Sequence, residues 1–579
     1  GLATSGVAKQ DYSKSEGLLQ YVDPYIGSGF HGHVFVGTSV PYGMVQLGPN
    51  NIHKGWDWCS GYHYSDSILI GFSHTHLSGT GCTDLGDILI MPLNEIRTPR
   101  GNQDDIRDGY ASKYSHDNEI ARPEYYSLIL DRYNIKAELT ATDRVGFHRY
   151  TYPKTEQANL IFDIGNKQGE SGEVKDAEVQ YFEDGRVEGY VITSPVYVNI
   201  YQKGADVRMY FSAVLNKKPV QVGTFVKDVV NPGKHQEKGP GAGLYMTFST
   251  EEQEAVEVKV GLSYTSIENA RFNRETEAAD VTFDQAKKNA TDVWNESLSR
   301  IYVEGGKETD KVKFYTGLFH ALLGRGLASD ANGYYPKNNG TVGRIALDEE
   351  GNPVHQHYNT DAIWGGFWNL TQLWSLAYPE YYSDWIKSQL LVYQDTGWLG
   401  DGIACSKYVS GVGTNFTSLA IAAAYNCGIR DFDVKQGYEA ALKNEVEWRG
   451  RLEGAGKMDV RQFVERGYSP YEKRFDMVTR EEGSGFGASH TMEYSFSSFA
   501  VSQFAKHLGK EDDYKLLSNL SNGWKNLYDP ETRLIRPKDT KGNFLEDFNP
   551  LAPWKGFQEG NAVQYTFSVS YTHLTLPTT

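Results

Sequence analysis

Two patterns of apolar and polar positions divide the chain. From about Tyr21 to Ser266, short runs such as "AELTATDRVGFHRYTY" and "AVEVKVGLSY" alternate apolar and polar residues, and Gly, Pro, Asn and Asp separate them. Alternation with a period of two is typical of strands that bury one face in an antiparallel sheet. This region therefore predicts an all-β sandwich.

Further along, apolar residues recur every three or four positions. In "FDQAKKNATDVWNESL" this spacing places six apolar residues on one face of a helix, which we interpret as a helical linker: Phe283, Ala286, Ala290, Val293, Trp294 and Leu298. The same periodicity predicts helices at 311–328, 381–396, 417–428, 433–448, 490–508 and 511–528. Paired helices with long loops favour an (α/α) toroid whose loops form a pocket at one end.

Length and charge exclude several classes of protein. A chain of 579 residues is too long for one core, so two to four domains are expected. The formal charge of −17 argues against a nucleic-acid partner or an anionic membrane surface, because both require basic patches. No segment approaches 18 consecutive apolar residues, so no membrane span is predicted. The four cysteines form no zinc or CxxC pattern.

Two glycine-rich segments in the β region carry many polar and aromatic residues. They are "YIGSGFHGHVFVGTSVPYGMVQLGPN" and "GWDWCSGYHYSDSILIGFSHTHLSGTGCTDLGD", and the second contains Trp58, His74 and His76. A His-x-His pair on a strand is compatible with zinc, but no catalytic ligand set is completed nearby. Turns with hydrogen-bonded histidines are the plain alternative. We favour loops that reach across a domain boundary and line a polar pocket.

Two segments of the helical half contain candidate site residues. The aromatic run "HYNTDAIWGGFWNLTQLWSLAY" is better explained as core, and Asp361 is the better pocket candidate. Glu493, within an apolar helix, is either an acid with a shifted pKa or a hydrogen-bonded structural carboxyl, and we favour the structural role. In "PWKGFQEGNAVQYTF", apolar neighbours around Glu559 would raise the pKa of its carboxyl, as a proton donor requires.

These motifs, in this order, resemble those of glycoside hydrolase family 92. The resemblance rests on "VDPYIGSGFHGHVFVGTSVPYGMVQLGPN", "GYHYSDSILIGFSHTHLSGTG", "FYTGLFHALL", "YPEYYSDWIKSQLLVYQDTGWL", "ASHTMEY" and "EGNAVQYTF", and it covers roughly residues 21–567. The family comprises calcium-dependent exo-acting α-mannosidases common in glycan-foraging bacteria. The resemblance therefore implies a glycan substrate, calcium as cofactor and a secreted or periplasmic location.

The resemblance also implies a multidomain β + α fold. We expect a flexible segment at 1–20, an N-terminal antiparallel β-sandwich at 21–270, a helical linker at 271–306 and an incomplete (α/α)6 catalytic toroid at 307–567. An inverting mechanism is implied, with Glu559 as general acid and a second carboxylate as base. The resemblance implies that Trp58, His74 and His76 contribute to sugar recognition. Asp361, Trp364 and Gln564 are further candidate substrate-binding residues, and the metal ligands are unknown.

Several positions depart from the family pattern. Trp364-Gly365-Gly366-Phe367-Trp368 stands where Trp-Asp-Thr-Phe-Arg is usual, so the glycone or the linkage could differ from that of simple mannobiose. We expect the chain to end before the general base, the tail at 568–579, which ends in "SYTHLTLPTT", to be non-native, and the chain itself to be inactive. The alternatives are a catalytically inactive glycan-binding protein on the same scaffold, or a hydrolase or phosphorylase of another clan.

Overall fold

The computed structural model describes residues 17–82, 85–102, 105–168, 171–324, 326–360, 363, 365–409, 413–473 and 483–568. Two compact units are present. The first, the sandwich unit, comprises 1–197, 205–336 and 342–354, and the second, the helical unit, comprises 198–204, 337–341 and 355–579. Each unit is described by itself below.

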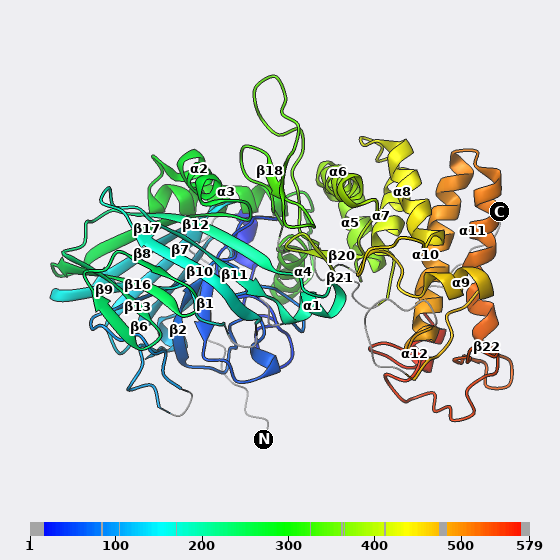
Figure 1. Cartoon of the computed structure of the whole chain (residues 1–579), viewed down its shortest axis with the longest axis horizontal. Helices are drawn as coiled ribbons and strands as arrows, with labels where there is room; N and C mark the ends of the chain where they lie inside the picture. The colour runs from blue at the N-terminus through cyan, green and yellow to red at the C-terminus, as the bar shows by residue number, and fades with distance from the viewer. Residues whose placement is uncertain are drawn as a thin grey trace. The chain divides into compact units, whose positions relative to one another are not determined.

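The sandwich unit contains two antiparallel sheets (Figure 1). The first has the order β1-β2-β3-β9-β16-β13-β14, with β4 beside β2. Its strands are β1 (Gly48–Asn51), β2 (Ile68–Ser73), β3 (Leu89–Leu93), β4 (Ser112–Lys113), β9 (Thr155–Asp163), β13 (Gln221–Val226), β14 (Val229–Pro232) and β16 (Ala242–Thr250).

The second sheet has the order β15-β10-β11-β12-β17-β8-β7-β6-β5. Its strands are β5 (Ile120–Arg122), β6 (Tyr125–Leu130), β7 (Ile135–Ala141), β8 (Val145–Tyr152), β10 (Glu173–Tyr181), β11 (Val187–Ser194), β12 (Val207–Leu215), β15 (Gln236–Lys238) and β17 (Glu254–Ser263). Phe162 of the first sheet stacks on Phe211 of the second, with ring centroids 6.1 Å apart. The two sheets therefore share one apolar core, which confirms the predicted sandwich.

Three helices belong to the same unit: α2 (Ile267–Ala278), α3 (Phe283–Leu298) and α4 (Glu308–Ala321). Helix α2 packs on β12 and β17, and α3 packs on β7 and β8. Five of the six apolar residues that the periodicity predicts form the buried face of α3, whereas the sixth, Val293, is exposed because it lies at the edge of this face. Thr282 and Gln285 form a capping box at the start of the helix. Trp294 fixes this helix to the sandwich, because its indole N–H donates to the carbonyl of Ser39 at 2.7 Å.

The boundary between the units differs from the one expected at residue 306. The sandwich unit continues to residue 354 and includes α4 and the hairpin of β18 (Tyr334–Pro336) and β19 (Val342–Arg344). Backbone hydrogen bonds explain this difference: Tyr42 N–H donates to the carbonyl of Leu322, and Leu327 N–H donates to that of Tyr42. The first helix expected for the toroid thus packs with the sandwich.

The helical unit carries the helices from α5 to α12. They are α5 (Leu370–Ala377), α6 (Pro379–Thr396), α7 (Phe416–Asn426), α8 (Val434–Val446), α9 (Val460–Arg466), α10 (Gly487–His507), α11 (Glu511–Ser521) and α12 (Ala562–Thr566). Two small hairpins, β20 (Gly402–Ala404) with β21 (Lys407–Val409) and β22 (Tyr528–Asp529) with β23 (Leu534–Ile535), lie between them. Helix α10 is central, since it packs against α7, α8 and α11.

A β-sandwich followed by a helical domain is the architecture that the sequence predicts. In the part of the chain that the structure describes, no helix has both the length and the apolar composition needed to cross a bilayer.

Candidate active site

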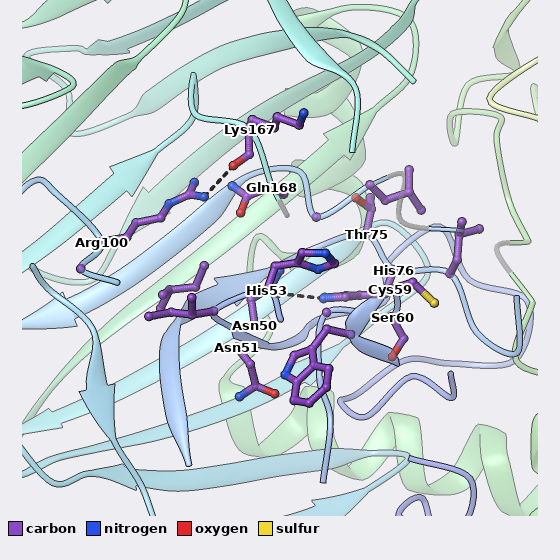
Figure 2. Close-up of a pocket in the computed structure, with 18 residues that line it drawn as sticks. Asn50, Asn51, His53, Cys59, Ser60, Thr75, His76, Arg100, Lys167 and Gln168 are labelled. Atoms are coloured by element: carbon purple, nitrogen blue, oxygen red, sulfur yellow. Dashed lines mark hydrogen bonds between the residues drawn. The ribbon is translucent and has the colours of Figure 1, made fainter. Parts of the chain in front are cut away.

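A polar cavity of about 240 Å³ lies in the sandwich unit (Figure 2). Its lining comes from β1, from the segment around the short 3-10 helix Trp56–Trp58, and from the glycine-rich loop that follows β2. Residues 100–101 and 167–168 complete the wall. Among the described residues, the second glycine-rich segment supplies much of this lining, and the first supplies its last residue, Asn50. The lining lies within the sandwich unit, so it does not test the prediction that these loops reach across a domain boundary.

Trp58 lines this cavity and is rigidly held. Its indole N–H donates to Asp66 Oδ2 at 2.8 Å, and its ring stacks on His63 with centroids 4.3 Å apart and planes at 20°. Lys54 also forms an ion pair with Asp66 at 3.1 Å. Because a fixed aromatic ring loses little entropy on binding, Trp58 is suited to contact the apolar face of a sugar.

His76 also lines the cavity, and both of its ring nitrogens have partners. The Nδ1–H group donates to the carbonyl of Gln46 at 2.9 Å, and burial lowers the pKa of the ring to about 4. The ring is therefore neutral at pH 7. Its Nε2 lies 2.9 Å from Asn50 Oδ1 and 3.1 Å from the Ser73 hydroxyl, which donates to Asn50 Oδ1 at 2.7 Å. His76 shapes the wall without adding charge.

His74 lies in the interior of the sandwich, and the cavity lining does not include it. Its Nδ1–H donates to the carbonyl of Ile88 at 2.7 Å, and its Nε2 lies 2.9 Å from Nε2 of His148. The Tyr150 hydroxyl lies 2.6 Å from Nδ1 of His148. The contacts form one chain of hydrogen bonds: Tyr150 O–H donates to His148 Nδ1, His148 Nε2–H donates to His74 Nε2, and His74 Nδ1–H donates to the carbonyl of Ile88. Both ring nitrogens of His74 have protein partners, and the geometry is that of a structural histidine.

The separation of His74 from His76 has a local cause. The His-x-His spacing predicts one shared face only if the segment is a strand, but β2 ends at Ser73. The chain beyond Ser73 is irregular, so the two rings take different environments.

The segment that carries Glu559 is anchored on the first turn of α10 in the helical unit. The backbone N–H groups of Ala488 and Ser489 donate to the carbonyl of Gly556, and the N–H of Gln558 donates to the Ser489 hydroxyl at 3.0 Å. Phe557 is buried in a cluster with Ala488 and other apolar residues. This region of the loop is therefore held by both hydrogen bonds and packing.

Gln564 and Asn561 form a capping box at the start of α12. Asn561 Oδ1 accepts a hydrogen bond from the Gln564 N–H at 3.1 Å, and Gln564 Oε1 accepts one from the Asn561 N–H at 3.0 Å. The side-chain carbonyl of Gln564 thus holds the turn next to Glu559.

Glu559 itself has an unusual backbone conformation. Its φ is +54°, in the left-handed region that few residues other than glycine adopt. The residue is exposed, yet partial desolvation of its carboxyl raises its pKa. A non-glycine residue kept in a costly conformation is frequent at functional sites.

A second carboxyl, that of Glu493, lies near the same segment. Glu493 follows Ser489 by one turn of α10, and the charges of Glu493 and Glu559 both raise the pKa of the Tyr565 hydroxyl, which burial already raises. Burial, with a smaller effect from the charge of Asp401, raises the pKa of Glu493 to about 8. Among the described residues, none donates a hydrogen bond to either glutamate carboxyl.

Asp401 completes this acidic region and was not identified from the sequence. Its carboxylate accepts hydrogen bonds from the Thr414 hydroxyl at 2.7 Å and from the Phe416 N–H, at the start of α7, at 2.8 Å. Burial raises its pKa to about 6, although these bonds oppose the rise. The only signal in the sequence was its position in the glycine-rich stretch "GWLGDG" after a helix.

Two predicted substrate-binding residues, Asp361 and Trp364, lie outside the described residues. In the parts that are described, no three Asp, Glu, His or Cys side chains come together as a group that could hold a metal ion. Arg100 and Gln168 line the sandwich cavity, but the sequence motifs did not single them out.

A β-sandwich with a polar, aromatic cavity and a helical domain with a carboxyl of raised pKa together are typical of a carbohydrate-active enzyme. Comparison with known families agrees with this class. Residues 21–263 match the glycosyl hydrolase family 92 N-terminal domain, and residues 269–577 match the glycosyl hydrolase family 92 catalytic domain. The chain belongs to glycoside hydrolase family 92.

Individual relatives extend the comparison. The chain is 26% identical to an uncharacterized secreted glycosidase of Arthroderma benhamiae, over 95% of this chain and 67% of that protein. It is 27% identical to a family 92 α-mannosidase of Bacteroides thetaiotaomicron solved in complex with mannoimidazole, with a TM-score of 0.86 over 95% of this chain and 70% of the other. A family 92 inverting mannosidase of the same bacterium, at 22% identity, has the same fold, with a TM-score of 0.80 over 94% and 70% of the two chains.

Proposed function

We propose that the protein is an exo-acting α-mannosidase that releases terminal mannose from glycans with inversion, and that Glu559 is its general acid. The observation that carries this proposal is the state of Glu559. Its carboxyl has a raised pKa, and it stands in a strained turn between a loop fixed to α10 and a capped helix. The family membership and the mannosidase relative at 27% identity support mannose as the sugar that is released.

In this mechanism Glu559 gives its proton to the departing glycosidic oxygen. A raised pKa keeps the donor protonated near neutral pH, where an ordinary glutamate has lost its proton. Inversion also needs a second carboxylate, ~6.5–9.5 Å from the first, to activate a water on the opposite face of the sugar. Glu493 does not suit that role, because a carboxyl with a pKa of about 8 is protonated at pH 7. We therefore assign no general base.

Calcium is a proposed cofactor that rests on the family resemblance. Calcium takes six to eight oxygen ligands, and no group of three metal-binding side chains is found among the described residues. These residues do not by themselves form such a site, and the proton transfer from Glu559 is proposed without a metal contact. Activity before and after treatment with EGTA, and after return of calcium, tests the requirement.

We propose a secreted or periplasmic location, which the secreted relative supports. Separation of medium, periplasm and cytoplasm of the natural host, followed by immunodetection, tests this location.

The acid assignment is tested with Glu559→Gln in the protein as its natural host produces it. On an α-mannoside with an alkyl or sugar leaving group, kcat should fall by ~10²–10⁴. An activated aryl mannoside, which needs little protonation, should lose far less. Glu531→Gln, at an exposed glutamate of the same unit, is the matched control and should keep full activity. NMR of the first product anomer reports inversion, and equal activity of Glu559→Gln and wild type on the alkyl substrate would disprove the assignment.

A further inference from the structure

The wall of the sandwich cavity outside the glycine-rich loops contains unmatched hydrogen-bonding groups. Figure 2 shows Arg100, Lys167 and Gln168 on one side of the view and Cys59, Ser60 and Asn51 on the other. The charge of Lys167 is already paired, because its Nζ forms an ion pair with Glu173 at 3.0 Å. Arg100 and Gln168 remain as the polar side chains of this wall.

Arg100 is fixed by three partners and keeps one donor group unmatched. Its Nε donates to Asp163 Oδ2 at 3.1 Å and to the Tyr110 hydroxyl at 3.2 Å, and its Nη1 donates to the carbonyl of Lys167 at 2.6 Å. Its Nη2 is buried and has no hydrogen-bond partner among the described residues. An N–H group buried without a partner has lost its hydrogen bond to water without replacement, so a ligand oxygen at this point would be favoured.

Gln168 supplies the complementary acceptor. The residue is only 9% exposed, its Nε2 donates to the carbonyl of Asn166 at 3.4 Å, and its Oε1 is buried with no partner in the described part of the chain. Gly86 allows this placement, because a Cβ there would lie 2.9 Å from Cβ of Gln168. With φ of +93°, Gly86 also has a backbone that other residues rarely adopt.

The chemistry of the pair indicates an uncharged ligand. Asp163 already neutralises Arg100, so the wall carries no excess positive charge for an anion. A hydroxyl group is both acceptor and donor, and it satisfies an N–H and a carbonyl oxygen at once. The cavity, about 240 Å³, is smaller than the ~300–1,000 Å³ of sites for drug-sized ligands, so it suits one sugar residue.

We propose that Arg100 and Gln168 determine sugar specificity by binding one hydroxyl of a glycan residue in this cavity. Arg100 Nη2–H donates to the hydroxyl oxygen, and the hydroxyl hydrogen is donated to Gln168 Oε1. The inference rests on the proposed glycan substrate, but it concerns recognition and does not depend on Glu559 or on turnover.

The test is calorimetric binding of methyl α-mannoside and its four monodeoxy analogues to the whole protein. Gln168→Met removes the acceptor with little change of volume, and Arg100→Lys removes Nη2 while keeping a cation beside Asp163. Gln157→Met, at an exposed glutamine of the same unit, is the control. Each cavity variant should bind the parent sugar about tenfold more weakly than the wild type. One deoxy analogue should bind to the wild type and to the cavity variants with equal affinity, because it lacks the hydroxyl group that Arg100 and Gln168 bind.

Other results would overturn the inference. These are binding of the parent sugar within twofold of wild type by both variants, an equal loss for all four analogues, displacement of the sugar by inorganic phosphate, or absence of mannoside binding by the wild type. The first three of these results would not contradict the proposed mannosidase function. The last contradicts that function too. Normal binding with no effect of Glu559→Gln on turnover would instead contradict the acid assignment alone.

Discussion

Gln564 and Asn561 exchange hydrogen bonds between side chain and backbone, and this pair closes the turn that presents Glu559. The sequence suggests Gln564 as a sugar ligand, whereas its side-chain carbonyl is used to start α12. Both roles can be separated by substitution, because a capping box accepts glutamate as well as glutamine at this position.

We predict that Gln564→Glu keeps the stability of the wild type, whereas Asn561→Ala lowers the free energy of unfolding by about 1 kcal/mol. The cause is the loss of the side-chain oxygen that accepts the Gln564 N–H. Urea denaturation measures the global effect, and hydrogen exchange of residues 560–566 measures the local one. If Gln564 mainly contacts the sugar, Gln564→Glu should instead raise KM with no change in exchange.

Glu493 should make stability depend on pH. Its pKa in the folded protein is about 8 against an ordinary value of 4.5, so between these pH values the folded state holds a proton that the unfolded state releases. Stability from this group is therefore complete below about pH 4.5 and decreases by about 1.4 kcal/mol per pH unit as the pH rises to about 8. Glu493→Gln should remove this decrease and be relatively more stable at pH 8 than at pH 5. Parallel unfolding curves for both proteins across this range would mean that Glu493 is ionised in the fold.

The buried ion pair of Lys457 and Glu445 predicts a non-additive pair of substitutions. Both side chains are fully buried, and the Glu445 carboxylate also accepts hydrogen bonds from Asn415 at 2.6 Å and Ser498 at 2.7 Å. Lys457→Met leaves a buried carboxylate without its cation and should cost about 3–5 kcal/mol. Adding Glu445→Gln should recover part of this loss, because a neutral amide keeps acceptor and donor groups for Asn415 and Ser498. A double-mutant cycle from urea denaturation measures the coupling, and simple additivity would contradict the prediction.

Local patterns predicted the elements of this fold well. The stripe from Phe283 to Leu298 is the buried face of α3, and 381–396 lies within α6. These predictions succeed because burial of a helix face depends on spacing within one segment. Most of the predicted helix ends fall within about three residues of the observed ones. The helices expected at 311–328 and 511–528 are exceptions, because they end at Ala321 and Ser521.

The sites needed information that one segment does not contain. His74 and His76 share a motif but not an environment, since that depends on where β2 ends. Asp401 acquires its raised pKa from burial against α7, and Arg100 acquires its orientation from Asp163, 63 residues away. Contacts of this kind depend on the tertiary fold, and no periodic pattern in the sequence predicts them.

The left-handed conformation of Glu559 gives a last prediction, on the cost of holding the acid in place. At φ of +54° a Cβ costs roughly 1 kcal/mol, which glycine avoids. Glu559→Gly should therefore be about 1 kcal/mol more stable than Glu559→Ala, although both lack the carboxyl and both should lose turnover of alkyl mannosides. At Glu531, which has no positive φ, the order should be reversed, because glycine there only adds freedom to the unfolded chain. The free energies of unfolding of the four variants decide the matter. If the alanine variant is more stable than the glycine variant at both positions, the backbone at position 559 is not strained, and the conformation of Glu559 is no sign of a functional constraint.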